Sequence, residues 1–468
     1  MSEKSICILG AGPAGLVTAL KLKQLGYNPL VLDFKKAAGI DFVQSLSPGV
    51  FTLLETVGIG MNELHEVCRP IARSFKFWNG KMIETERPPG FLTERNQFDS
   101  WLQKIAIKKG ISLLLDARVN SLEQTNEGWE ICLLQNGKYQ TCNAGFLVDA
   151  SGKRSIIRGV KKRVAASTLA ISGCWDNTGI AGNETLLESG RNYWFWGATL
   201  SNGTFHATLF MDPELSRIPG GDGLVRLYKY YIGRTQLFKG CLRGRLHGNL
   251  VANDVTPFYY ENPSGLNYIK VGESSVGLDP VSSQGIQSSM AGAIQSAIVI
   301  NTILANPNQA VPAIAFYKER QREVISFHLE KISSTYAAVH PWKNNLFWTK
   351  RIMSAHPLQS RPEPEYWNSS QKVEFSPEAG LVPTNCIIDN QIKSRAGLVH
   401  PLLNRPIVFW ENTEIATILG NLQGSFDPSE WVGRWSEKIK PVAAVRLFNE
   451  LKNMGVLMEA RIKYDGIL

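Results

Sequence analysis

Residues 5–36 decide the fold, and they read SICILGAGPAGLVTALKLKQLGYNPLVLDFKK. A short apolar run leads directly into a Gly-x-Gly-x-x-Gly motif. Apolar residues at helical spacing follow, and a second apolar run ends on the carboxylate of Asp33. This order predicts a strand, a tight turn, a helix and a second strand. Such a unit is typical of a dinucleotide-binding domain, and a chance glycine turn is the alternative.

The three glycines of this motif have separate physical tasks. Gly10 permits the tight turn from strand to helix, Gly12 lets a pyrophosphate approach the backbone, and Gly15 allows the helix to pack closely against the strand. The N-terminus of the predicted helix offers unpaired N–H groups and a positive dipole end to the phosphates. Asp33 follows Gly15 at the distance where the ribose hydroxyls need an acceptor.

The composition is that of a folded protein with room for two or three domains. The chain has 468 residues, of which 44% are hydrophobic and 19% are charged. Seven dispersed cysteines without a Cys-x-x-Cys pair indicate reduced thiols, not a disulfide framework or a metal site. The net charge of +9 is mild for this length, and the absence of a Lys/Arg block argues against nucleic-acid binding.

No segment of the sequence predicts insertion into a membrane or export. We find no uninterrupted run of about 18 apolar residues, so we expect no membrane span. The N-terminus enters the first predicted strand without a basic and then apolar leader. We therefore expect a cytoplasmic protein that does not bind membranes.

Two further motifs lie at the ends of predicted strands. Residues 149–152 read DASG, and these small residues let a cofactor approach while the carboxylate of Asp149 holds a hydroxyl or orders the turn. Residues 272–286 read GESSVGLDPVSSQGI. Here Asp279 can accept from a ribityl hydroxyl, and a helix that begins at Gly285 can stabilise negative charge on a reduced flavin. An ordinary glycine turn and a polar turn with a helix cap are the alternatives.

Together with residues 94–99, these motifs resemble the FAD-dependent monooxygenase superfamily, which includes aromatic hydroxylases, geranylgeranyl reductases and flavin-dependent halogenases. The resemblance covers residues 1–340 and implies FAD as the cofactor. Glu273 departs from the family pattern, which has aspartate there, and keeps the charge with a longer reach. The cofactor-binding residues implied, with their neighbours in the same motifs, are Gly10, Gly12, Pro13, Ala14, Gly15, Asp33, Ser45, Arg95, Asp149, Gly152, Gly272, Asp279, Ser283, Gln284, Gly285 and Ile286.

The predicted fold class is α/β, with a Rossmann-like FAD-binding domain of the aromatic-hydroxylase and halogenase type. Alternating patterns, aromatic residues and glycine turns after about residue 165 predict an antiparallel sheet, which the resemblance places over the flavin as a lid. The predicted domains are an FAD-binding domain at 1–165 plus 261–340, an antiparallel-sheet substrate domain at 166–260, a linker at 341–375 and a small C-terminal winged-helix-like module at 376–468.

The C-terminal module is predicted from a strand followed by three helices. This order resembles the winged-helix units that recognise peptides on enzymes modifying ribosomal peptides, and a plain helical cap is the alternative. We expect its strand at 402–410 and its helices at 411–419, 428–435 and 441–454, the last of which buries Val445, Phe448 and Leu451.

Turn and cap signals predict several local elements in the rest of the chain. Asn79-Gly80 and Asn136-Gly137 each predict the turn of a β-hairpin. Asn96 predicts the N-cap of a helix at 97–109. Further helices are expected at 49–57, 285–304 and 313–340.

Residues 193–200, YWFWGATL, resemble a worn form of the halogenase motif in which Trp-x-Trp precedes Ile-Pro. Trp194 and Trp196 are present, whereas Ala198 and Thr199 replace the Ile-Pro end. We expect both tryptophans in the substrate pocket, as candidate catalytic residues. An aromatic strand in the core of a sheet is the alternative.

Halogenases of this superfamily also use a lysine, just before a strand that ends in Trp-Gly. The nearest match here offers Arg69 and Arg73 before the strand and Lys76 inside it. A guanidinium stays protonated and cannot relay a proton as a tuned ammonium can. The sequence therefore favours hydroxylation over halogenation.

The runs at 279–286 and 44–48 are most similar to flavoproteins that oxidise a tryptophan of a partner protein during biogenesis of cysteine tryptophylquinone. This resemblance implies an FAD-dependent monooxygenase that hydroxylates tryptophan in a protein or peptide substrate. Reducing equivalents come from NAD(P)H directly or through a flavin reductase, and the C-terminal module docks the partner. A flavin-dependent halogenase and an FAD-bearing maturation chaperone without turnover are the alternatives.

Overall fold

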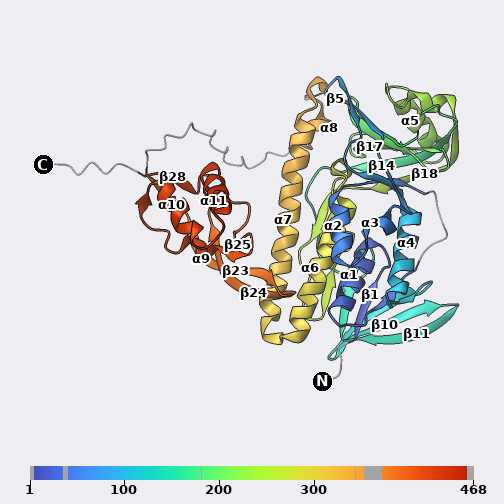
Figure 1. Cartoon of the computed structure of the whole chain (residues 1–468). Coiled ribbons are helices and arrows are strands. Elements are labelled where there is room, and N and C mark those ends of the chain that lie inside the picture. The colour runs from blue at the N-terminus through green and yellow to red at the C-terminus, as the bar shows by residue number, and fades with distance from the viewer. Residues whose placement is uncertain (1–4, 35–40, 181, 343, 353–371, 461–468) are drawn as a thin grey trace. The chain divides into compact units, whose positions relative to one another are not determined.

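The computed structural model describes residues 5–34, 41–180, 182–342, 344–352 and 372–460 (Figure 1). The chain divides into two compact units, residues 1–353 and residues 354–468, and each unit is described by itself. All three cofactor motifs that the sequence predicts belong to the first unit.

A five-stranded parallel sheet lies at the centre of the first unit. In sheet order its strands are β20 (Tyr268–Lys270), β12 (Phe146–Asp149), β1 (Ile6–Leu9), β2 (Leu30–Leu32) and β8 (Ser112–Leu114). Strands β1 and β12 are buried along their whole length, as expected where helices cover a parallel sheet. The predicted order of strand, tight turn, helix and strand at the N-terminus is confirmed.

Helices of the first unit pack on this sheet and on one another (Figure 1). They are α1 (Pro13–Gln24), α2 (Gly49–Thr56), α3 (Met61–Leu64), α4 (Arg95–Lys108), α6 (Gly285–Ala305), α7 (Ala310–Ala337) and α8 (Leu346–Thr349). By length and composition α6 could cross a membrane, with a mean hydropathy of 1.4. In the fold it packs against α1 and α7, and half of its apolar stretch is buried.

A seven-stranded sheet forms the second layer of this unit. In sheet order its strands are β18 (Arg245–Asp254), β14 (Leu169–Asp176), β17 (Phe205–Met211), β16 (Tyr193–Thr199), β15 (Glu184–Ser189), β5 (Arg73–Trp78) and β6 (Lys81–Glu86). The predicted antiparallel sheet is confirmed, and only β5 and β15 pair in parallel. The hairpin at residues 73–86 also belongs to this sheet, although it lies outside the predicted 166–260 segment. Helix α5 (Asp222–Ile232) covers one face of the sheet.

Smaller sheets complete the first unit. They are β3 (Val43–Leu46), β7 (Phe91–Glu94) and β4 (Cys68–Pro70); β11 (Lys138–Ala144), β10 (Gly128–Gln135) and β9 (Arg118–Thr125); and β13 (Lys161–Arg163), β19 (Phe258–Tyr260) and β21 (Val276–Gly277). Short 3₁₀ turns lie at Lys239–Arg243, Gly272–Ser274, Pro280–Ser282, Pro307–Gln309 and His340–Trp342.

Strand β16 separates two cores because its side chains alternate between the faces of the sheet. Tyr193 and Phe195 pack in a cluster with Tyr228 on α5. Trp194, on the opposite face, packs in a cluster with Phe210 and with aromatic residues of α7 and α8. Trp194 and Trp196 therefore share the face that looks away from α5.

Both hairpin turns are confirmed, whereas the predicted helix cap is wrong. Asn79 and Asn136 each have positive φ, as the following glycines do, which is the geometry of tight hairpin turns. Helix α4 begins at Arg95, before Asn96, and its N-cap residue Glu94 makes no side-chain cap bond. The backbone N–H of Asn96 instead donates to Oδ1 of Asp41 at 3.0 Å, so the capping carboxylate comes from a distant loop.

Residues 346–352, which the sequence assigned to a linker, belong to the core of the first unit. Trp348 on α8 is fully buried, and its indole N–H donates to the carbonyl oxygens of Gly190 and Arg191. Arg351 is 2% exposed and lies 3.3 Å from Oδ2 of Asp212. The aromatic pair Phe347-Trp348 is the sequence signal for this burial, because both side chains are fully buried.

Replacing Arg351 with alanine is expected to destabilise the first unit strongly. Removal of one partner of a buried ion pair leaves an uncompensated charge and costs about 3–5 kcal/mol. Thermal unfolding of the flavin-free protein measures the loss, and Arg226→Ala, at an exposed position, is the matched control. Equal melting temperatures for the two variants would contradict the buried pair.

The second unit has a hydrophobic core of its own. Its elements are β22 (Val373–Phe375), β23 (Gly380–Ile388), β24 (Gln391–Val399), β25 (Phe409–Trp410), β26 (Thr413–Glu414), α9 (Ile415–Leu419), β27 (Ser425–Phe426), α10 (Pro428–Ser436), α11 (Pro441–Asn453) and β28 (Leu457–Glu459). Trp431 and Trp435 on α10 pack with Phe448 and Leu451 on α11 and with Val373 on β22.

Several local predictions for this unit are wrong in their extent. The strand expected at 402–410 is confined to its last two residues, and the helix expected at 411–419 begins only at Ile415. Residues 413–414 instead pair with β25 as a short strand. Val445 is 46% exposed, because the buried face of α11 runs through Ala444, Leu447, Phe448 and Leu451. The long hairpin β23–β24 was missed.

Candidate active site

The glycine motif has the geometry of a ligand cradle. A Cβ at Gly10, whose φ is +111°, would overlap the carbonyl oxygen of Ala150, and a Cβ at Gly15 would overlap the carbonyl oxygen of Gly10. A Cβ at Gly12 would meet only Nη2 of Arg95, at an ordinary 3.6 Å. The fold itself therefore requires Gly10 and Gly15, whereas the space at Gly12 is left for a ligand. This arrangement fits a pyrophosphate lying on the backbone.

A cavity of about 210 Å³ opens at the N-terminus of α1. The guanidinium of Arg95 lines it and is held by Asp99, to whose carboxylate oxygens Nε donates at 2.9 and 3.0 Å. The free N–H groups of the helix end and this guanidinium together favour an anion. The other predicted cofactor residues that line this cavity are Gly12, Pro13, Ala14, Gly152, Gly285 and Ile286.

The two acidic residues at the strand ends lie apart from this cavity wall. Asp33 follows β2 and is half-buried, and it is not among the residues that line this cavity. Asp149 is fully buried and accepts four hydrogen bonds from the turn that follows it, through the backbone N–H groups of Ser151 and Ile157 and the hydroxyls of Ser151 and Ser155. Of the two roles predicted for Asp149, these bonds support the ordering of the turn.

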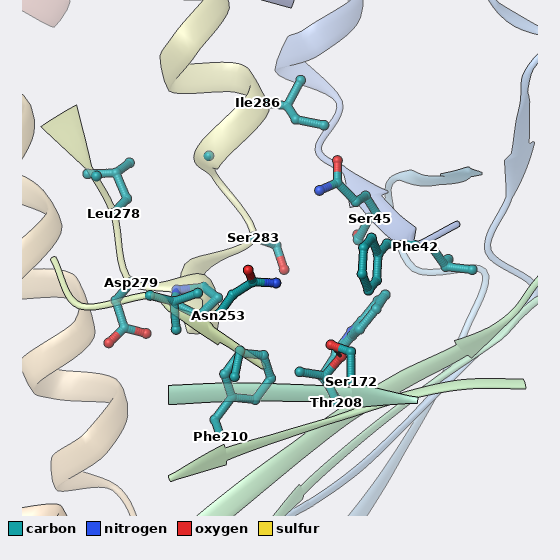
Figure 2. Close-up of a pocket in the computed structure, with 18 of the residues that line it drawn as sticks. Phe42, Ser45, Ser172, Thr208, Phe210, Asn253, Leu278, Asp279, Ser283 and Ile286 are labelled. Carbon is teal, nitrogen blue, oxygen red and sulfur yellow. Dashed lines mark hydrogen bonds between the residues drawn. The ribbon is translucent and has the colours of Figure 1, made fainter. Parts of the chain in front are cut away.

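A second cavity, of about 330 Å³, adjoins the first (Figure 2). The two share Gln44, Glu273, Gly285 and Ile286 in their walls, so the cradle leads directly into it. The seven-stranded sheet forms one wall, and the loop from β21 to α6 forms another. Its lining is largely aromatic and hydroxylic, and it includes Phe42, Ser45, Ser172, Trp194, Trp196, His206, Thr208, Phe210, Asn253 and Ser283.

The loop from Gly272 to α6 brings the third predicted motif to both cavities. Ser283 adopts positive φ and lines the second cavity together with Ser45 (Figure 2). Gly285 is the first residue of α6, and nothing lies within 4 Å of where its Cβ would be. Gly272 and Gln284 line a further cavity between this loop and α7.

Asp279 lies in the wall of the second cavity, with its side chain turned towards α7 (Figure 2). Its Oδ1 accepts from the hydroxyl of Tyr336 at 2.9 Å and from the backbone N–H of Val281 at 3.0 Å. Its own backbone N–H donates to Nε2 of His328 at 2.7 Å. Burial raises the pKa of the Asp279 carboxyl. These bonds anchor the loop to α7, a role that differs from the predicted acceptor for a ribityl hydroxyl.

Both predicted tryptophans line the second cavity. Trp194 is 1% exposed and stacks on Phe210, with ring centroids 3.7 Å apart. Trp196 is half-buried, and its ring meets that of His206 edge to face at 6.2 Å. The sequence predicted that these tryptophans lie either in a substrate pocket or in the core of a sheet. Trp194 does both, because it lines the cavity and packs in a core cluster.

His206 also lines the second cavity, although no motif in the sequence includes it. It is 3% exposed, lines the second cavity and lies edge to face against Phe42 at 5.4 Å. Burial lowers the pKa of its imidazole to about 4. The missed signal is the alternation along β17, which puts His206, Thr208 and Phe210 on one face.

The lysine of the halogenase pattern has no counterpart in the predicted segment. Lys76 lies on β5 beside the ring of Trp78 and is not part of the cavity lining, while Arg69 pairs with Glu94 at 3.3 Å. Lys153, from the turn after β12, does line the cavity, and its Nζ donates to the carbonyl oxygen of Asp254. Burial lowers the pKa of this ammonium.

Comparison with known proteins agrees with this geometry. Residues 3–172 match the family model of the FAD binding domain, so this part of the chain is an FAD-binding domain. The fold around this domain is that of solved flavin-dependent aromatic hydroxylases and halogenases, which supports a flavin-dependent oxidoreductase. Among solved structures it resembles the peptidyl tryptophan dihydroxylase QhpG, with 23% identity, coverage of 97% of this chain and 100% of that chain, and a TM-score of 0.78.

Other relatives belong to the same class of flavoprotein. The structure of the flavin-dependent halogenase CmlS has a TM-score of 0.80 at 16% identity, covering 99% of this chain and 97% of that chain. The putative FAD-dependent oxidoreductase LodB of Marinomonas mediterranea is 24% identical over 75% of this chain and 97% of its own length. The tryptophan 2-halogenase of Chondromyces crocatus is 23% identical over 76% of this chain and 72% of its own length. The predicted resemblance is confirmed.

Proposed function

We propose that this protein is an FAD-dependent monooxygenase that hydroxylates a tryptophan within a protein or peptide. The observation that carries this proposal is the aromatic cavity that adjoins the cofactor cradle. Phe42, Trp196 and the stacked pair of Trp194 and Phe210 give it flat apolar walls suited to an indole ring. The likeness to a peptidyl tryptophan dihydroxylase supports the same substrate class.

Residues of the chain position the reactants for this chemistry. Gly12, Arg95 and the N-terminus of α1 hold the pyrophosphate, while Ser283 and Gly285 place the N-terminus of α6 beside the cavity. When bound, reduced FAD supplies activated oxygen to the substrate ring. The aromatic lining excludes water and fixes the ring, which are the protein's main contributions to the rate.

The proposal also covers the electron donor, the cellular compartment and the partner protein. Reducing equivalents come from NAD(P)H directly or through a flavin reductase. We place the protein in the cytoplasm, and the C-terminal unit is proposed to capture the partner protein. The reaction then serves as a post-translational step in maturation of a tryptophan-derived quinone cofactor.

Halogenation is the second candidate, and Lys153 is the observation that favours it. A lysine in the cavity wall with a lowered pKa can relay a proton, which is the property that the segment at residues 69–78 lacks. Mass spectrometry of a candidate partner after incubation with the reduced, FAD-loaded protein separates the functions. Hydroxylation adds one or two oxygen atoms to a tryptophan, halogenation adds a halogen isotope pattern, and an FAD-bearing chaperone changes nothing.

Trp196→Ala is expected to reduce oxygen transfer to that partner while FAD stays bound. Misplacement of a reacting ring by about 1 Å costs on the order of 100-fold in rate. Trp194→Ala is a poorer probe, because Trp194 also fills the sheet core and its removal costs about 3–5 kcal/mol. Trp342→Ala, outside this cavity, is the control. Unchanged turnover in Trp196→Ala would exclude its ring from substrate positioning.

A further inference from the structure

A row of three polar side chains crosses the sheet wall of the second cavity. Ser172 on β14 lies opposite Thr208 on β17, and their hydroxyl oxygens are 2.8 Å apart. Oγ1 of Thr208 lies 3.4 Å from Nε2 of His206. All three line the cavity, and their exposures are 6%, 5% and 3% in this order. Figure 2 shows Ser172 and Thr208 rising from the strands towards the space in front of Phe42.

This polar row is flanked by aromatic rings. Phe42 and Trp196 meet the imidazole edge to face. Nδ1 of His206 is buried and has no hydrogen-bond partner among the residues that the structure describes. A buried polar group left unpaired costs about 1–3 kcal/mol, so a hydrogen bond from a ligand to Nδ1 would recover that free energy.

We propose that His206, oriented by Thr208 and Ser172, accepts a hydrogen bond from the ring N–H of the aromatic substrate. The inference rests on the proposed function, because it assigns the polar contact through which the same cavity selects an indole. It makes His206 a substrate-binding residue and makes Thr208 and Ser172 positioning residues.

The protonation state of His206 suits this task. Burial lowers the pKa of the imidazole to about 4, so the ring is neutral near pH 7 and has one donor and one acceptor nitrogen. When Nε2–H donates to Thr208, whose hydroxyl donates in turn to Ser172, Nδ1 is left as the acceptor. This is the tautomer that can accept a ring N–H at Nδ1.

Such a contact discriminates between rings of the same shape. A site built around a hydrogen bond rejects an analogue that lacks the donor, because the buried acceptor is then left unpaired. The flat aromatic walls alone bind indole and its N-methyl derivative about equally well, since both rings bury similar apolar area. The preference for the N–H therefore isolates the contribution of the polar row.

The test is calorimetric titration of the FAD-loaded protein with indole and with 1-methylindole. We expect the protein to bind indole about tenfold more tightly, the equivalent of one hydrogen bond of about 1.4 kcal/mol. His206→Leu is expected to abolish this preference and His206→Gln, which keeps an acceptor, to retain part of it. Thr208→Val is expected to weaken the preference, and flavin absorbance confirms that each variant holds its cofactor.

Thr185→Val is the matched control, because Thr185 is a buried threonine of the same sheet that does not line this cavity. It is expected to keep the preference for indole. Equal binding of the two rings by the unaltered protein, or a preference that survives in His206→Leu, overturns the assignment while leaving the cavity an indole site. Binding of neither ring overturns the proposed function together with this inference.

Discussion

Gly12→Val is expected to abolish FAD retention while leaving the protein folded. The position has room for a side chain as far as the protein is concerned, because a Cβ there meets only Arg95 at 3.6 Å. The branched side chain would occupy the place of the pyrophosphate against the N-terminus of α1. Absorbance of the purified protein at flavin wavelengths, with circular dichroism for the fold, measures the effect.

Two other glycine variants separate loss of the ligand from loss of the fold. Gly15→Ala places its Cβ on the carbonyl oxygen of Gly10 and is expected to lose the folded domain together with the flavin. Gly220→Val, at an exposed position with nothing within 4 Å of its Cβ, is expected to keep both. A folded Gly12→Val protein that purifies with stoichiometric flavin would show that the cradle is assigned wrongly.

The second large effect is expected from a chain that ends near residue 365. Both cavities are formed by residues before 330, and the second unit has its own core. The shortened protein is therefore expected to purify with bound flavin. It is expected to lose capture and modification of the partner protein, because a separate docking unit supplies affinity away from the reacting ring.

Pull-down of a candidate partner by the two forms, with flavin absorbance read in parallel, measures this effect. A colourless shortened protein would show that the second unit supports the FAD-binding fold. Equal capture of the partner by both forms would reduce the second unit to a structural cap.

The sequence predicted the features whose causes are local. The Gly-x-Gly-x-x-Gly motif and the two Asn-Gly turns depend on backbone conformations that the residues themselves impose, and the structure has them. The parallel pairing of β1 with β2 follows from helix α1, which connects them. The motifs were therefore sufficient to predict both the fold class and the cofactor.

Features that depend on distant contacts escaped prediction. The prediction that Asn96 caps α4 was wrong. The backbone N–H of Asn96 donates instead to the carboxylate of Asp41, which is far away in the sequence. The role of Asp279 as an anchor depends on Tyr336, which lies on another helix. His206 belongs to no sequence motif, and its place in the cavity wall depends on Thr208 and on the aromatic rings around it.

The anchoring of Asp279 to α7 has a consequence for the order in which a nascent chain matures. The glycine motif leaves the ribosome first, but the wall that completes the cavity needs Gly285, and that loop is tied to Tyr336. Contacts of such high sequence separation form late, after most of the chain has been made. A ribosome-bound fragment that stops before α7 has the phosphate cradle without an anchored wall. Stable flavin binding is therefore expected only after α7 has been made, although the glycine motif lies at the start of the chain.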